Sequence, residues 1–482
     1  MSELTIAQKI VPGNFEPENH WYPKALNATI HPLINFFLHL SKDRIIKRYC
    51  HLHPKVRPEV LGEVLKYQPK YFRWAGADLM HVTDAEGNRK MVVIENNSCP
   101  SGQKSMPLQD DNQEMGGYRL LVERTIKPTL GKKVKGIPGA LAVIYDKNPM
   151  EATGYANAMA TLFEEPVHLI TYYHDDPNPG VRFEDGVMMV RTETDTWTPI
   201  RGAFRYLTQK PWTRLPINCK TRILNPVVAC LAGGRNKMVA SKAYDLYNST
   251  LDGSGLEILT PETIWDVSKE EIPLWVQKMG GQAVIKNPYS NAGQGVWTIV
   301  NDHELDAFME RDYPYGRFIV QSLIGNYEWS STSARGKFYH IGTMPSDKGN
   351  TYVADIRLMV SATESGIRPI GVYARRALKP LLDQISESTD SWEMLGTNLS
   401  VKNAEGNWDT DTNRLLLMDR RDFNRLGIGL DDLIEAYIQT VLSMIAIDKM
   451  CINLFNSKGK FRMRLFKSLN DDDALLNEIM AP

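Results

Sequence analysis

The pattern in the middle of the chain constrains the fold most. A short apolar strand is predicted at residues 140–145, a helix at 151–163 and a second strand at 167–171. Two strands joined by a helix lie parallel in one sheet, with the helix on its face. The same layer is expected to continue through residues 186–190 and to end near 222–225. The chain is therefore predicted to be an α/β protein with a parallel, doubly wound layer.

Length and charge set the number of domains and exclude two classes of partner. At 482 residues the chain is too long for one hydrophobic core, so two or three domains are expected. The formal net charge of −1 gives no global field that would attract nucleic acid or an acidic membrane. No run of about 18 apolar residues is present, so no transmembrane helix is expected. A basic stretch with Gly and Pro at residues 131–139 predicts a domain boundary.

An acidic hairpin precedes that boundary, after a helical region at about residues 25–70. One predicted strand ends at Asp78, a turn follows at residues 84–88, and a second strand leads into Glu95 and Asn97. Three hard oxygen ligands gathered at one hairpin suit Mg²⁺. The alternative is that Asp78 caps an element and Glu95 is a solvated surface residue. Metal binding is favoured, because clustered carboxylates seldom collect without an ion to neutralise them.

The N-terminus and the cysteines indicate a cytoplasmic protein. The first residues lack the apolar stretch of a signal peptide. The cysteines show no CxxC spacing, so we interpret them as free thiols in a reducing cytosol. Cys99 lies beside the acidic hairpin, but no histidine pattern marks it as a nucleophile, so a buried thiol is the favoured interpretation. The other cysteines are Cys50, Cys219, Cys230 and Cys451.

Two lysines are candidates for binding phosphate. Lys286 ends a predicted strand at residues 282–286, and a loop with two glycines returns into a strand at 295–300. Glycine lacks the Cβ that would keep backbone N–H groups away from phosphate oxygens, although an ordinary hairpin turn is the alternative. Lys237 opens a predicted helix at residues 237–247, whose first turn would face anions. The loop residues of interest are Ser290, Gly293, Gln294 and Gly295.

Later strands carry polar side chains at their ends. An apolar strand at residues 317–321 is followed by a polar residue, and its end offers backbone N–H and C=O groups that can hydrogen-bond to the edge of a nucleotide base. Neighbouring strands at 354–360 and 370–374 are expected to present Arg357 and one arginine of the following pair on one face. A surface charge is the alternative for any single arginine.

Taken in order, these segments resemble the ATP-grasp superfamily. The motifs N-P…N-K, V-I-K-N-P…G-Q-G-V, I-V-Q-S-L-I and D-I-R…R-R-A…G-T-N span residues 225–400. The resemblance implies that lysines and the glycine loop bind ATP phosphates, that one strand exit holds adenine, and that arginines stabilise the transferring phosphoryl group. It assigns ATP binding to Lys237, Lys286, Ser290, Gly293, Gln294, Gly295, Gln321 and Ile324, and catalysis to Arg357, Arg376 and Asn398.

The position of the acidic hairpin implies a circular permutation. ATP-grasp enzymes carry a segment like A-G-V-D…E-V-N-x-x-P-G, whose Asp, Glu and Asn bind magnesium, usually after the Asn loop. Here the match, with Asp78, Glu95 and Asn97, lies near the N-terminus. This resembles circularly permuted members such as eukaryotic glutathione synthetases and glutathionylspermidine synthetases. A weaker copy, Asp448 with a strand-like segment at 461–470, lacks the second carboxylate and is disfavoured.

The resemblance divides the chain into four parts. Residues 1–135 would hold the helical region and the metal hairpin as part of the C-terminal lobe, and 136–235 a Rossmann-like preceding domain. Residues 236–325 would form the nucleotide lobe, and 326–482 the rest of the C-terminal lobe with a helix at 430–447. An insertion at 325–353 would form a lid or part of the acceptor pocket.

The implied chemistry is ATP-dependent ligation of a carboxylic acid to an amine through an acyl phosphate, with release of ADP and phosphate. The cofactors would be ATP and two Mg²⁺ ions, for which Mn²⁺ can substitute. An amino acid, peptide or polyamine would be the partner substrate, and a homodimer is expected. The alternatives are an ATP-grasp phosphotransferase and a non-catalytic nucleotide-binding protein. The loop at 101–107 resembles a substrate loop, and Arg201 and Arg205 either bind a carboxylate or are exposed structural charges.

Overall fold

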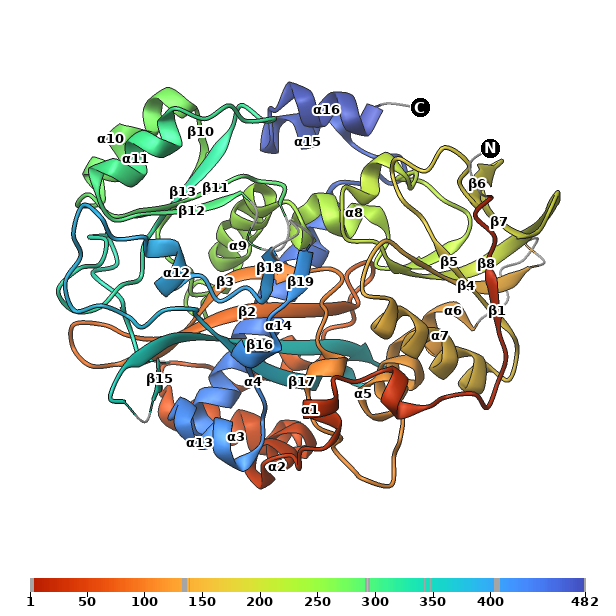
Figure 1. Cartoon of the computed structure of the whole chain (residues 1–482), viewed down its shortest axis with the longest axis horizontal. Coiled ribbons are helices and arrows are strands. Elements are labelled where there is room, and N and C mark those ends of the chain that lie inside the picture. Colours follow the sequence, from red (N-terminus) through yellow and green to blue (C-terminus); the bar gives the residue numbers. More distant parts are fainter. Residues whose placement is uncertain are drawn as a thin grey trace.

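The computed structural model combines three main sheets with helices (Figure 1), and the predicted α/β class is confirmed. It describes residues 4–131, 137, 139–290, 293, 295–341, 343–346, 348–402 and 408–480. Gln294 therefore lies outside the described residues. Among the helices of this part of the chain, none is long and apolar enough to cross a membrane.

The first sheet contains the predicted β-α-β unit. Its strand order is β1-β5-β4-β8-β7-β6, with β9 beside β8. Strands β4, β5, β8 and β9 run parallel, but β6 and β7 form an antiparallel extension, so the expected continuation of the parallel layer at 186–190 is wrong. Helix α7 (Pro149–Phe163) covers β4 and β5. The strands are β1 (Gln8–Ile10), β4 (Ala140–Tyr145), β5 (Val167–Thr171), β6 (Val181–Glu184), β7 (Val187–Glu193), β8 (Thr196–Tyr206) and β9 (Arg222–Leu224).

The second sheet is antiparallel and contains the acidic hairpin. Its order is β14-β2-β16-β17-β20, with β3 paired to β2 and β15 to β16. Asp78 lies in the middle of β2, opposite Glu95 on one side and Arg357 on the other, so the prediction that a strand ends at Asp78 is wrong. The strands are β2 (Trp74–Thr83), β3 (Arg89–Asn97), β14 (Tyr339–His340), β15 (Thr343–Pro345), β16 (Thr351–Thr363), β17 (Gly366–Arg376) and β20 (Leu415–Leu416).

Helices close to the chain ends cover the second sheet. The long helix α14 (Leu430–Asn453) contacts β2, β3 and β16 and buries most of its residues. It runs unbroken through Gln439 and Ser443, because both side chains find hydrogen-bond partners inside the core. The predicted helical region is confirmed as α1 (Pro23–Leu26), α2 (Pro32–His39), α3 (Lys42–Leu52) and α4 (Pro58–Lys66).

The third sheet has four antiparallel strands in the order β10-β13-β11-β12. Helix α9 (Lys237–Leu251) packs against it, and the Asn236 side chain caps the helix by accepting a hydrogen bond from the Val239 backbone N–H. The elements are β10 (Thr263–Val267), α10 (Ile272–Lys278), β11 (Ala283–Lys286), β12 (Val296–Ile299), α11 (Asp302–Met309) and β13 (Phe318–Ser322).

The C-terminal segment is helical where a strand was expected. Residues 461–470 contain α15 (Met463–Leu469), and α16 (Asp473–Met480) follows. The buried Asp448 carboxylate accepts hydrogen bonds from the Tyr67 hydroxyl and three backbone N–H groups at residues 70–72, so it ties a loop to α14. A metal role for this second copy of the motif does not fit these contacts.

The remaining elements are mostly short. One helical segment runs from α5 through a π-helical turn to α6. Strand β18 pairs with β19 in a two-stranded ladder. These elements are α5 (Gly116–Leu121), α6 (Lys127–Leu130), α8 (Val227–Ala229), α12 (Ser391–Leu395), α13 (Arg420–Leu426), β18 (Ser400–Lys402) and β19 (Trp408–Thr410).

Candidate functional site

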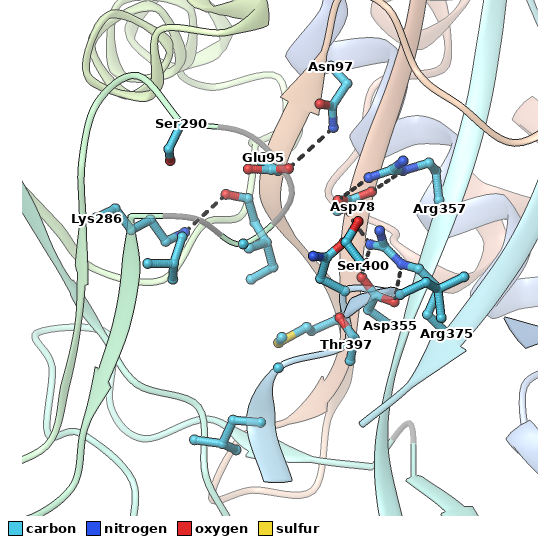
Figure 2. A pocket seen from close by; sticks show the side chains of 18 of the residues that line it. Asp78, Glu95, Asn97, Lys286, Ser290, Asp355, Arg357, Arg375, Thr397 and Ser400 are labelled. Atoms are coloured by element: carbon cyan, nitrogen blue, oxygen red, sulfur yellow. Dashed lines mark hydrogen bonds and ion pairs between the residues drawn. The ribbon is translucent and has the colours of Figure 1, made fainter. Parts of the chain in front are cut away.

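A cavity of about 300 Å³ lies between the second and third sheets and extends to the carboxyl end of β4. Its size falls at the lower limit of small-molecule sites. Charged side chains enter it from both sheets (Figure 2). The predicted site residues that line it are Asp78, Glu95, Asn97, Lys237, Lys286, Ser290, Gly293, Gln321, Ile324, Arg357 and Asn398.

Arg375, and not the predicted Arg376, joins Arg357 at this cavity. Side chains alternate between the faces of a strand, so only one of two consecutive arginines can face the cavity. The Arg376 guanidinium lies instead over the Tyr352 ring, 4.7 Å from its centroid. The prediction chose Arg376, whose side chain lies on the other face of the strand. The sequence alone does not give the strand register that decides between Arg375 and Arg376.

Two arginines hold the Asp78 carboxylate. Arg357 donates from Nε to Oδ1 at 2.5 Å and from Nη2 to Oδ2 at 2.6 Å, and Arg375 Nη2 lies 3.0 Å from Oδ2. Arg375 also binds Asp355 in the neighbouring strand. Burial alone would raise the pKa of Asp78, but the two guanidinium groups lower this pKa below its usual range. Asp78 therefore stays ionised and anchors both arginines (Figure 2).

Glu95 lies nearer the third sheet, among a lysine pair and an amide. Lys237 Nζ is 3.5 Å from Glu95 Oε2, and Asn97 Nδ2 donates to Oε1 at 3.4 Å. Burial would raise the pKa of Glu95, but Lys237 and Lys286 lower it, so the carboxylate is ionised. Lys286 Nζ donates to the Ile94 carbonyl at 3.5 Å, and burial lowers the pKa of Lys286 to about 8.

The donors at this site fit a divalent cation only in part. Among the described residues, no group of three or more His, Cys, Asp and Glu side chains could hold a metal ion. Both oxygens of Asp78 already accept hydrogen bonds from arginines, which makes Asp78 a poor magnesium ligand in this arrangement. Glu95 and Asn97 offer hard oxygens at the cavity and fit part of a shell that ligand oxygens would complete.

The glycine loop joins β11 to β12 beside the lysines. Lys237 Nζ donates to the Ser290 carbonyl at 3.0 Å, which ties the start of α9 to the loop. Gly293 and Gly295 have φ of +74° and +72°, a region that glycine adopts without strain. A Cβ at Gly293 would lie 2.9 Å from the Trp392 ring, so the loop packs closely there. Gly295 lines a neighbouring cavity.

Residues that the sequence did not single out complete the cavity at the end nearest β4. They include Lys147, two residues beyond that strand, Arg235 before α9, and the Tyr373 ring. Burial, reinforced by the nearby Arg235, lowers the pKa of Lys147 to about 8. The position of Lys147 after a parallel strand was the one available signal, because ligands bind at the carboxyl ends of such strands.

The predicted substrate loop lines the cavity, whereas two predicted arginines do not. Ser101 and Gly102 donate to the fully buried Glu151 of α7, at 2.5 and 2.7 Å, which fixes the loop. Arg205 is buried and donates to the backbone carbonyls of residues 98, 207 and 225. Arg201 pairs with Glu165 and the carbonyl of residue 139. Both arginines are structural, and Arg205 is not exposed.

Cys99 also lines the cavity, but its thiol is inert. The residue is buried, and burial raises the pKa of the thiol to about 12. The thiol therefore stays protonated at neutral pH and lacks nucleophilic character. The interpretation of Cys99 as a buried thiol agrees with this environment.

No protein-family model and no curated protein matches the chain. Among solved structures, a RimK-domain ATP-grasp protein from Sphaerobacter thermophilus is 14% identical, with a TM-score of 0.29 over 51% of this chain and 92% of that one. A glutathione synthetase-like effector from Globodera pallida is 8% identical, with a TM-score of 0.40 over 73% and 86%. D-alanyl-alanine synthetase A from Vibrio cholerae is 11% identical, with a TM-score of 0.30 over 63% and 99%.

The solved structures to which the chain is similar thus include one described as an ATP-grasp protein. The circular permutation stays a prediction.

Proposed function

We propose that this chain is an ATP-grasp enzyme that joins a carboxylic acid to an amine at the expense of ATP. The observation that carries the proposal is the cavity between two antiparallel sheets, at which Lys237, Lys286 and Arg357 converge. These cations approach from both sheets, as stabilisation of a transferring phosphoryl group requires. The proposal includes the circular permutation, since the N-terminal hairpin β2–β3 completes the sheet of β16 and β17.

The nucleotide would lie along the third sheet. Lys237, Lys286 and the loop from Ser290 to Gly295, Gln294 included, would bind the triphosphate with side-chain and backbone N–H donors. The exit of β13, from Gln321 to Ile324, would hold adenine, because it offers backbone donors and acceptors within an apolar wall. Residues 236–325 would form the nucleotide lobe.

Magnesium would be bound by Glu95 and Asn97 together with phosphate oxygens. When bound, it would supply positive charge that offsets the charge developing on the transferring phosphoryl group. Asp78 takes a different role in the proposal: it orients Arg357 and Arg375 towards the cavity rather than binding the metal.

The chain's own residues would then act in positioning. The substrate carboxylate attacks the γ-phosphorus, forming an acyl phosphate and ADP, and the amine then attacks the acyl carbon as phosphate leaves. Arg357 lines the cavity beside the loop at 101–107, since its Nη1 donates to Tyr373 Oη at 3.2 Å and to the Ser101 carbonyl at 3.4 Å. Arg357 would stabilise the acyl phosphate, and Asn398 would help to orient it. Tyr373 also lines the cavity.

The test is a screen of amino acids, dicarboxylic acids, peptides and polyamines with Mg·ATP. ADP that forms only when both an acid and an amine are present, with an amide detected by mass spectrometry, is the expected result. A phosphorylated product without an amide would indicate a phosphotransferase instead. Absence of ADP formation with every pair, from protein that binds no Mg·AMP-PNP, would reject the proposal.

A further inference from the structure

The carboxyl end of β4 forms a crevice that extends the cavity. In the first sheet β4 lies between β5 and β8. From the end of β4 the chain crosses to β5 on one side, and from the end of β8 it crosses to β9 on the other side. Such a switch point is the usual ligand site of an open parallel sheet. Lys147 follows β4 and Thr208 follows β8, each two residues beyond its strand, and both line the cavity. A second cavity of about 340 Å³ shares these two residues with the first.

The nearest carboxylate does not neutralise Lys147. Asp146 precedes it, but the Asp146 oxygens accept from Arg214 at 3.0 Å and from the Thr208 backbone N–H and hydroxyl at 2.9 Å. The Lys147 ammonium group makes no hydrogen bond to any of the described residues. Because the Asp146 carboxylate is already neutralised by Arg214, the Lys147 ammonium group at the cavity wall would be stabilised by an anion from a ligand.

Two more cations, Lys104 and Arg235, line the same crevice. Lys104 is only 6% exposed, donates to the Asn148 side-chain oxygen at 3.2 Å and lies 5.0 Å from the centroid of the Tyr22 ring. Arg235 contacts the Asn97 side-chain oxygen and the backbone carbonyl of residue 99, both at 3.5 Å. The Lys104 partners carry no charge, so Lys147 and Lys104, with Arg235 beside them, lower the free energy of an anion placed among them.

This anion differs from the triphosphate that we propose on the third sheet. Lys147 extends from the first sheet, and Lys104 belongs to the loop that the buried Glu151 anchors to that sheet. Lys237 and Lys286, by contrast, contact Ser290 and the backbone carbonyl of residue 94 on the nucleotide side. We infer that the acid substrate carries a second anionic group, a carboxylate or a phosphate, which Lys147, Lys104 and Arg235 bind. The inference rests on the proposed ligase function.

The test compares acids of matched length that differ only in the second group. Valerate, glutarate and 4-phosphonobutyrate, with homologues one carbon shorter and longer, are titrated into protein saturated with Mg·AMP-PNP, and binding is followed by saturation-transfer NMR. We expect the dianions to bind at least about ten-fold more tightly than the monoanions, in line with one charge-assisted contact. A preference for glutarate identifies a carboxylate subsite, and a preference for 4-phosphonobutyrate identifies a phosphate subsite.

Variants assign the preference to the crevice. Lys147→Met should remove the preference and leave Mg·AMP-PNP binding unchanged, whereas Lys458→Met, at an exposed turn, should preserve both. Equal binding of monoanions and dianions, no binding of any dianion, or a preference that survives in Lys147→Met would overturn the inference. Loss of nucleotide binding in Lys147→Met would also overturn it, because the anion would then be the triphosphate. Failure of the unaltered protein to bind Mg·AMP-PNP would instead reject the proposed function.

Discussion

Replacing Lys286 by Met should stabilise the protein while it removes nucleotide binding. Burial lowers the pKa of Lys286 from 10.5 to about 8. Keeping its ammonium group charged in the folded protein therefore costs free energy of folding. Lowering the pKa of Lys286 from 10.5 to about 8 corresponds to about 3.4 kcal/mol of free energy. Methionine has a similar length and no charge, but it withdraws a cation from Glu95, so we expect a net gain of about 1–3 kcal/mol near pH 7.

The pH dependence gives the sign of this effect. Because the folded-state pKa is lowered, the unfolded chain binds more protons at Lys286 between pH 8 and 10.5, and stability rises with pH in that window. Urea unfolding of the unaltered protein should show this rise, and Lys286→Met should lack it. Isothermal titration calorimetry with Mg·AMP-PNP should show at least about ten-fold weaker binding by the variant. The reasoning would be refuted by a Lys286→Met variant that is less stable near pH 7, whose stability still rises between pH 8 and 10.5, or that binds the nucleotide normally.

Four further substitutions and one chemical modification test other parts of the account. Arg375→Ala should cost about 3–5 kcal/mol in urea unfolding, because it leaves the buried Asp355 carboxylate unpaired and removes one of the two cations on Asp78, whereas Arg376→Ala should cost less than about 1 kcal/mol. Asp448→Asn should cost about 2 kcal/mol without a change in nucleotide affinity. Glu95→Gln should abolish turnover with an unchanged circular dichroism spectrum, and retained turnover would exclude a metal role. Iodoacetamide at pH 8 should leave Cys99 unmodified in peptide mapping, since its pKa is about 12.

Most strands that build the cavity could be predicted, because each is a short apolar run bounded by Gly, Pro or polar residues. The runs at β4 and β11 show this, and Lys286, the last residue of β11, lines the cavity. The segment at 461–470 was mistaken for a strand, because a short apolar run does not separate strand from helix. In the structure this segment forms α15, which contacts α9 and buries only Phe466.

Pairing and long-range contacts could not be predicted. The bulge after Asp78 and the register between β2 and β16 decide that Arg357 meets this carboxylate, and no local pattern encodes that register. The choice between Arg375 and Arg376 failed for the same reason. Lys104, Lys147 and Arg235 come from three separate segments and meet only after the first sheet docks on the hairpin.

Isotope transfer tests the proposed ligation most directly. The acid that supports ADP release is labelled with ¹⁸O in its carboxylate, and phosphate from the reaction is examined by ³¹P NMR. An acyl phosphate intermediate leaves one carboxylate oxygen on phosphate, so we predict an ¹⁸O-shifted phosphate signal in proportion to the amide formed. Amide formation with unlabelled phosphate would contradict the account.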